Sequence, residues 1–112
     1  MKKLFLYFLF VGCFTFFTDA GNLSDASGTI TSGGTSQVLL AANTSVPRTW
    51  FYFQNLSTHV MWLGFGATAV QSQPSIQVAA NGGIFRMDNT VSDDAINVVS
   101  STTADAFTCK VR

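Results

Sequence analysis

Few side chains of this chain are of the types that do chemistry, and their spacing indicates no catalytic set. His59 is the single histidine and lies between a turn and the apolar run that starts at Val60. Cys109 alternates with Phe107 and Val111, a pattern typical of a small buried side chain rather than of a reactive thiol. A nucleophilic triad needs a base beside Ser or Cys and a third group that orients the base. We therefore predict that the chain is not an enzyme and has no catalytic residue.

The acidic side chains give no better indication of a metal site. Asp88, Asn89, Asp93 and Asp94 share one polar stretch and offer oxygen atoms of the kind that Ca²⁺ binds, but their spacing matches no calcium loop. A solvated turn explains them better. Zinc sites usually draw several ligands from His and Cys, whereas the chain after residue 20 has one of each. We predict no metal and no cofactor.

The elements that would position these residues centre on the aromatic stretch 48–69. With a period of two residues, the segment 48–54 divides into two faces. One face carries Thr49, Phe51 and Phe53, and the other carries Arg48, Trp50, Tyr52 and Gln54. A second aromatic run, 59–65, follows a turn at 54–58. We predict that the two runs form an antiparallel strand pair that is buried on at least one face.

Shorter strand patterns fill the rest of the chain. They are predicted at 29–31, 35–42, 75–79, 84–87, 95–100 and 106–112, and Asn81-Gly82-Gly83 indicates a turn that joins hairpin strands. No helix longer than one turn is expected after residue 20. The sequence thus predicts an all-β fold, a single small antiparallel β-sandwich or jelly-roll-like barrel of seven to eight strands.

Composition limits the possible functions. Charged residues make up 11% of the 112 residues and the formal net charge is zero, which argues against a nucleic-acid-binding surface. Hydrophobic residues make up 47%, enough for a core and against disorder. The length allows one domain. We divide the chain into a hydrophobic segment at 1–20, a Gly/Ser/Thr-rich leader at 21–34 and a sandwich domain at 35–112.

The N-terminal segment 1–20 has a basic start, an apolar middle and small residues before Gly21, which is the form of a secretory signal. Its apolar run is short for a membrane span, which needs about 20 residues. More than half of the chain's 11 phenylalanines lie in it. A signal or membrane anchor and a structural docking arm both remain open. As an arm, the segment would add hydrophobic area or a strand to a neighbouring protein.

Several segments of the body together resemble a family of small bacteriophage virion proteins. They are GTITSGGTSQVLLAAN at 28–43, Arg48 with WFYFQNLS at 50–57, WLGFGATA at 62–69, QPSIQVAANGG at 73–83 and AINVVSSTTADAFTCKVR at 95–112. The resemblance implies a compact, oligomeric β-sandwich that decorates or cements the phage head or sits on the tail. It brings no catalytic residues. A hydrophobic leader is unusual in that family.

From this resemblance we expect a structural virion protein on the capsid surface. Its expected partners are the major capsid protein or other virion proteins and further copies of itself, with a trimer as the guess by analogy. A tail or spike module that touches host glycans, or an exported periplasmic or extracellular binding domain, is the alternative. The aromatic side chains are the interface candidates. They are Phe5, Phe8, Phe10, Phe14, Phe16, Phe17, Trp50, Tyr52 and Trp62.

Overall fold

The computed structural model describes residues 23–43, 45–89 and 91–112, and in these residues the chain forms strands and no helix. In chain order the strands are β1 (Ser24–Asp25), β2 (Gly28–Thr29), β3 (Gln37–Leu40), β4 (Trp50–Asn55), β5 (Met61–Phe65), β6 (Ile76–Val78), β7 (Ile84–Asp88), β8 (Ile96–Ser100) and β9 (Ala106–Val111). Within the described residues nothing is therefore helical, long and apolar enough to cross a membrane.

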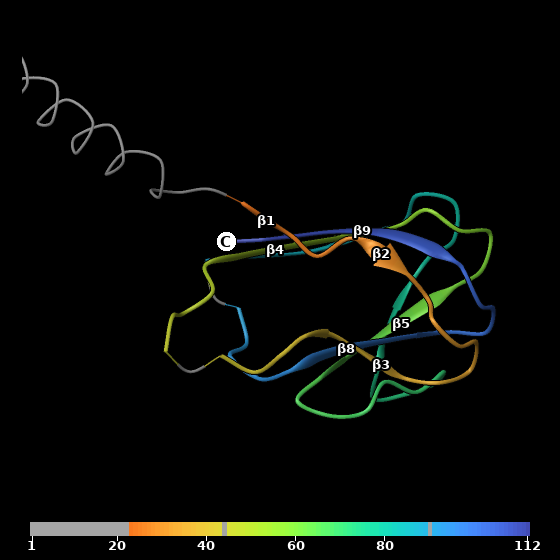
Figure 1. The fold of residues 1–112 in the computed structure, drawn as a ribbon, viewed down its shortest axis with the longest axis horizontal. Coiled ribbons are helices and arrows are strands. Elements are labelled where there is room, and N and C mark those ends of the chain that lie inside the picture. The colour runs from red at the N-terminus through yellow and green to blue at the C-terminus, as the bar shows by residue number, and fades with distance from the viewer. Residues whose placement is uncertain (1–22, 44, 90) are drawn as a thin grey trace, which may run out of the picture.

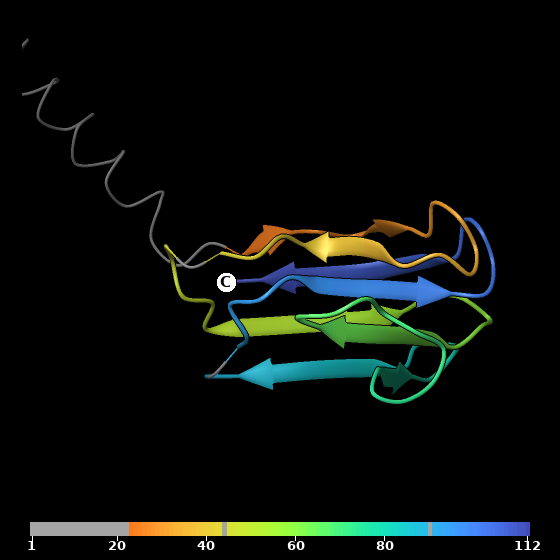
Figure 2. The ribbon, with the colours of Figure 1, turned by 90° about the horizontal axis from the view of Figure 1, so that it is seen from below.

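The strands form two antiparallel sheets packed face to face (Figures 1 and 2). Sheet A has the order β1-β9-β4-β7, with β2 also paired to β9, and sheet B has the order β3-β8-β5-β6. The prediction of an all-β antiparallel sandwich is confirmed. β1 and β2 are two pieces of one edge strand, interrupted where the Ser27 hydroxyl, instead of a backbone carbonyl, accepts the N–H of Cys109 at 2.9 Å. Counted so, the sandwich has eight strand positions.

The pairing of the strands is nested about the β5–β6 connection. β5 pairs with β6, β4 with β7, β3 with β8, and the β1/β2 edge with β9, always antiparallel. The chain is thus one long hairpin rolled into two sheets, and nearly every connection crosses from one sheet to the other. Double-sheet folds of eight strands with this arrangement are jelly rolls.

The core confirms the period-two reading of the central stretch. Phe51 and Phe53 of β4 are fully buried and point at sheet B, whereas Trp50 and Tyr52 point outward. The Phe53 ring stacks on Phe107 of β9 with centroids 5.3 Å apart. A buried aromatic side chain of this size contributes about 1.5–3 kcal/mol by burial alone. The core also contains Met61, Leu63, Ile96, Val98 and Cys109, all fully buried.

The predicted pairing of the two aromatic runs was wrong. β4 lies in sheet A between β9 and β7, whereas β5 lies in sheet B between β8 and β6. Both runs have a buried face, but the two faces pack against each other across the sandwich instead of lying side by side in one sheet. The cause is the turn after Asn55, which carries the chain from one layer to the other.

The turn at Asn81-Gly82-Gly83 also crosses between sheets instead of closing a hairpin, because β6 belongs to sheet B and β7 to sheet A. Asn81 and Gly82 have φ angles of 60° and 95°, which only short or glycine residues adopt readily. A Cβ on Gly83 would collide with the Ala79 carbonyl. The sequence therefore located this turn correctly but not the sheet to which it leads.

Candidate functional site

The outer face of sheet A gathers the aromatic and charged side chains that do not point into the core. Trp50 and Tyr52 lie two residues apart on β4, and their rings stack with centroids 5.8 Å apart and planes 9° apart. Tyr52 is in register with Arg86 of β7 on one side and with Lys110 of β9 on the other. The aromatic pair thus forms a strip between two strands that carry cations.

Each flanking cation has a carboxylate partner on the same face. Arg86 Nε lies 3.2 Å from Asp88 Oδ2, and Lys110 Nζ lies 3.3 Å from Asp25 Oδ1 on the β1 edge. Hydrogen bonds from Ser27, together with Lys110, lower the pKa of Asp25 to about 2. The face therefore combines an aromatic centre with charges of both signs at its border.

The outer face of sheet B is partly covered by the chain itself. The loop after β5 folds back so that Ala67 accepts a hydrogen bond of 2.7 Å from Asn97 Nδ2, and the Ala69 N–H donates to Ser36 Oγ at 3.0 Å. A Cβ on Gly64 would lie 2.7 Å from the Ala67 carbonyl oxygen, so the loop lies directly on the strand. Among the described residues, no loop lies across the outer face of sheet A in this way, and we call that face the open one.

Trp62, the third aromatic candidate of the body, lies on this outer side of sheet B. It is in register with Gln77 of β6 and Val99 of β8. Trp50 and Tyr52 therefore share one surface, and Trp62 lies on the opposite side of the sandwich. Sequence analysis did not distinguish the three side chains, because all of them occupy outward positions of strands.

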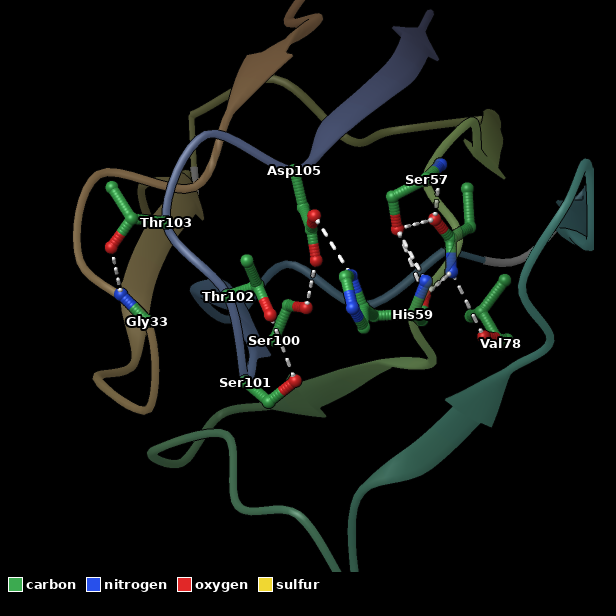
Figure 3. A network of polar contacts seen from close by, with 10 residues as sticks. Gly33, Ser57, His59, Val78, Ser100, Ser101, Thr102, Thr103 and Asp105 are labelled. Carbon is green, nitrogen blue, oxygen red and sulfur yellow. Dashed lines mark hydrogen bonds and ion pairs between the residues drawn. The ribbon is translucent and has the colours of Figure 1, made fainter.

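A polar network lies at one end of the sandwich, where β4 leads toward β5 and β8 leads toward β9 (Figure 3). His59 Nδ1 lies 3.1 Å from the Oδ1 atom of Asp105. The Ser100 hydroxyl donates to the other carboxylate oxygen, Oδ2, at 2.6 Å. The His59 side chain is 45% exposed and that of Asp105 only 9%.

This arrangement differs from a nucleophilic triad in the placing of its members. In a triad the histidine stands between the carboxylate and the nucleophile, whereas here Asp105 stands between His59 and Ser100. The neighbouring Ser57 hydroxyl bonds to Asn55 Oδ1 and to the His59 carbonyl rather than to the imidazole. The network ties the loop after β4 to the loop before β9. The sequence identified His59 but not Asp105, which lies 46 residues away.

Two of the four residues in the polar stretch, Asp88 and Asp94, have side-chain partners. Asp88 pairs with Arg86, and Asp94 Oδ2 accepts from the Ser92 hydroxyl at 3.4 Å. In the described part of the chain no three His, Cys, Asp or Glu side chains lie close enough together to hold a metal ion. Cys109 is buried in the core as predicted, and burial raises the pKa of its thiol to about 12.

A shallow cleft of about 290 Å³ opens at the other end of the sandwich, between β3 and β9. Apolar side chains form much of its wall, namely Leu40, Val46, Pro47 and Val111. Arg48, at its border, donates to the carbonyls of Ala41, Ser92 and Asp94 and so holds the loop 41–48 against the loop 91–94. Because these bonds occupy its guanidinium, we assign Arg48 a structural role.

The six phenylalanine candidates of the N-terminal segment lie outside the described residues. They are Phe5, Phe8, Phe10, Phe14, Phe16 and Phe17. Their predicted role in docking stays a prediction, as does the choice between a signal and an arm for residues 1–20.

Comparison with known proteins adds no relative to this description. No family model matches the chain, and no curated protein or solved structure is significantly similar to it. The resemblance of residues 28–112 to phage virion proteins thus stays a prediction from the sequence.

Proposed function

We propose that this protein is a structural protein of a bacteriophage virion that decorates or cements the capsid through protein–protein contacts. Fold alone does not define function, but a jelly roll is an architecture that viral capsid domains use. The observation that carries the proposal is the open outer face of sheet A, with its Trp50–Tyr52 stack between two ion pairs. The resemblance of the body to small virion proteins supplies the setting.

The face is suited to docking on another folded protein. Aromatic side chains at the centre of a contact contribute most of the binding free energy, and surrounding polar groups fix the orientation and exclude water. The charges at the border alternate in sign, so they favour a partner surface of matched pattern over a uniformly charged polymer such as nucleic acid. Under this proposal the major capsid protein or another virion protein covers Trp50 and Tyr52.

A tail or spike module that binds glycans is the second candidate, and the same aromatic strip favours it. Aromatic rings exposed on a sheet can stack on sugars as well as on protein. The two candidates differ in the ligand that Trp50 contacts, so one set of variants tests both. The separation of Trp62 from Trp50 excludes a glycan platform made from both tryptophans.

The test is a binding assay on phage particles that lack the protein. Trp50→Ala and Tyr52→Ala should each weaken binding about tenfold or more, as truncation of a central aromatic anchor does. Trp62→Ala is the matched control, since it removes an outward aromatic side chain from the opposite sheet, and it should bind like the wild type. Unchanged binding by the Trp50 and Tyr52 variants would overturn the docking surface.

Two further readouts separate the alternatives. Loss of binding to host glycans in the Trp50→Ala variant, with particle binding unchanged, would support the tail or spike module instead. Intact mass of the protein from its natural source addresses the setting. A chain that keeps Met1 and is found in particles supports the virion role, whereas a free chain that starts near Gly21 supports an exported binding domain.

A further inference from the structure

β7 is the most regular edge strand of the described sandwich. It runs for five residues in unbroken register with β4, from Gln54 opposite Ile84 to Trp50 opposite Asp88. The other edges are shorter or irregular: β1 and β2 have two residues each, β6 has three, and β3 shifts register between Val38 and Leu40. In Figure 2, β7 forms the lower border of its sheet.

The hydrogen bonds between β4 and β7 show which groups of β7 face away from the sheet. Asn55 N–H donates to the Gly83 carbonyl and Asn89 N–H donates to the Thr49 carbonyl, both at 2.9 Å. In an antiparallel pair, alternate residues of a strand bond to the same neighbour. Residues 83, 85, 87 and 89 therefore face β4, and residues 84, 86 and 88 direct their N–H and C=O groups to the free edge.

The same three residues place their side chains on the outer face of sheet A. Ile84 is 57% exposed, and the side chains of Arg86 and Asp88 are 59% and 49% exposed. No other strand among the described residues pairs with this side of β7. Exposed edges of this kind bind a further strand unless charge or shape prevents it. Here the two charges have opposite signs and lie two residues apart.

We propose that β7 is a homodimer interface, in which the β7 strands of two copies pair antiparallel about a two-fold axis at Met87. In this register Arg86 lies opposite Asp88 of the second copy, and Asp88 lies opposite its Arg86. The backbone groups of both residues then bond across the interface, because both face the free edge. The edge is therefore complementary to itself.

Neighbouring registers lack this complementarity. Pairing centred on Arg86 would place the two arginines opposite each other, and like charges directly opposite destabilise a strand pair. Pairing centred on Phe85 would place Arg86 opposite Ile84 of the second copy and leave Asp88 without an opposite charge on that strand. The alternating charges thus select one register, as charges on edge strands commonly do in specifying or preventing pairing.

The dimer would extend sheet A through both copies, in the order β1-β9-β4-β7-β7-β4-β9-β1. A two-fold axis perpendicular to the sheet keeps both outer faces on the same side, so both Trp50–Tyr52 stacks would face one partner surface. Such a dimer could bind through two sites at once, with the gain that linked sites give. The contact closes with two copies and so does not itself form the trimer guessed from the resemblance. It does not depend on a virion role.

The test uses two full-length variants with charges of one sign at this edge. The Asp88→Arg variant has cations at both positions 86 and 88 of β7, and the Arg86→Asp variant has anions at both positions. The wild type should dimerise in a concentration series followed by native mass spectrometry. Each variant alone should dimerise at least tenfold more weakly, because like charges then face each other. An equimolar mixture, with one variant labelled with ¹⁵N, should form heterodimers in large excess over homodimers.

The mixture separates contact between chains from effects within one chain. Both variants lack the internal Arg86–Asp88 ion pair, so recovery of dimers in the mixture can come only from charges that meet across the interface. Association through residues 1–20 would combine the two variants in statistical proportions. A monomeric wild type, variants that dimerise like the wild type, or a mixture with no excess of heterodimers would each overturn the proposal.

Discussion

Replacing the side chain of Asn55 is the sharpest test of how the chain crosses from β4 in sheet A to β5 in sheet B. This side chain is fully buried at the end of β4 and uses all of its hydrogen-bonding capacity. Its Nδ2 donates to the carbonyls of His59 and Val78 at 2.7 and 3.3 Å, and its Oδ1 accepts the Ser57 N–H at 2.9 Å and the Ser57 hydroxyl at 2.7 Å. One side chain therefore connects the end of β4, the turn and β6. The burial also leaves no room for a glycan at Asn55, although Asn55-Leu56-Ser57 matches the acceptor pattern.

Asn55→Ala removes these four bonds and leaves one buried partner without compensation, the Ser57 N–H, which loses its acceptor. The Val78 carbonyl keeps the ladder bond to Met61, which lies opposite it in β5, and the His59 carbonyl keeps the Ser57 hydroxyl at 2.9 Å. Each buried group left unpaired costs about 1–3 kcal/mol. With one such group left unpaired and the other bonds of the amide lost, we expect the free energy of unfolding to fall by about 2–4 kcal/mol. This is a large share of the roughly 5–15 kcal/mol that typically stabilises a domain.

The assay is equilibrium unfolding in urea, with Asn97→Ala as the matched control. Asn97 is partly exposed, and its side chain makes one described bond, to the Ala67 carbonyl. Its truncation should cost about 0.5–1.5 kcal/mol. If Asn55→Ala destabilises the protein no more than Asn97→Ala does, the turn is held by other contacts, and our account of the crossing between sheets is wrong.

Three further predictions concern charged groups and the buried thiol. Arg48→Ala removes the donors to three loop carbonyls, so the unfolding free energy should fall by about 1–3 kcal/mol and amide exchange in the loops 41–48 and 91–94 should accelerate. The pKa of Asp25 is lowered from 3.8 to about 2, so its contribution to stability is complete above about pH 4 and is lost as the pH falls toward 2. Asp25→Asn should remove that part of the pH dependence of the melting temperature. Burial raises the pKa of the Cys109 thiol to about 12. In a Cys13→Ser variant, which has Cys109 as its one remaining cysteine, this thiol should not react with a thiol reagent at mildly alkaline pH until the protein unfolds. Fast reaction of the folded variant would contradict the burial.

The sequence predicted the faces of strands well because each face is a local property. In β4 the alternation of Phe51 and Phe53 with Trp50 and Tyr52 follows from the two-residue period of any strand, and burial follows that period in the structure. The same reasoning placed Cys109 in the core. The fold class follows from many short strands separated by turn residues, whatever their order in the sheets.

Strand partners were harder to predict because they depend on contacts distant in the sequence. The stretch after Asn55 has the composition of a turn, but composition does not tell a return within one sheet from a crossing to the other. The crossing needs Asn55 to bond to Val78 of β6, which comes 23 residues later. For the same reason the pairing of His59 with Asp105 left no local signal. The sequence therefore placed the turn but could not identify the layer into which it leads.

The candidate surfaces follow the same division between local and distant information. Trp50 and Trp62 looked alike in the sequence, since each occupies an outward position in an aromatic strand. They differ because the loop after β5 returns across sheet B, through the bond from Asn97 to Ala67, while no described segment covers sheet A in this way. The edge charges of β7 are a further case. Arg86 and Asp88 read as ordinary polar residues of a short strand until the register with β4 shows that their backbone groups face outward. With that register known, their spacing indicates pairing between two copies, because opposite charges two residues apart are complementary when a strand pairs with its own copy.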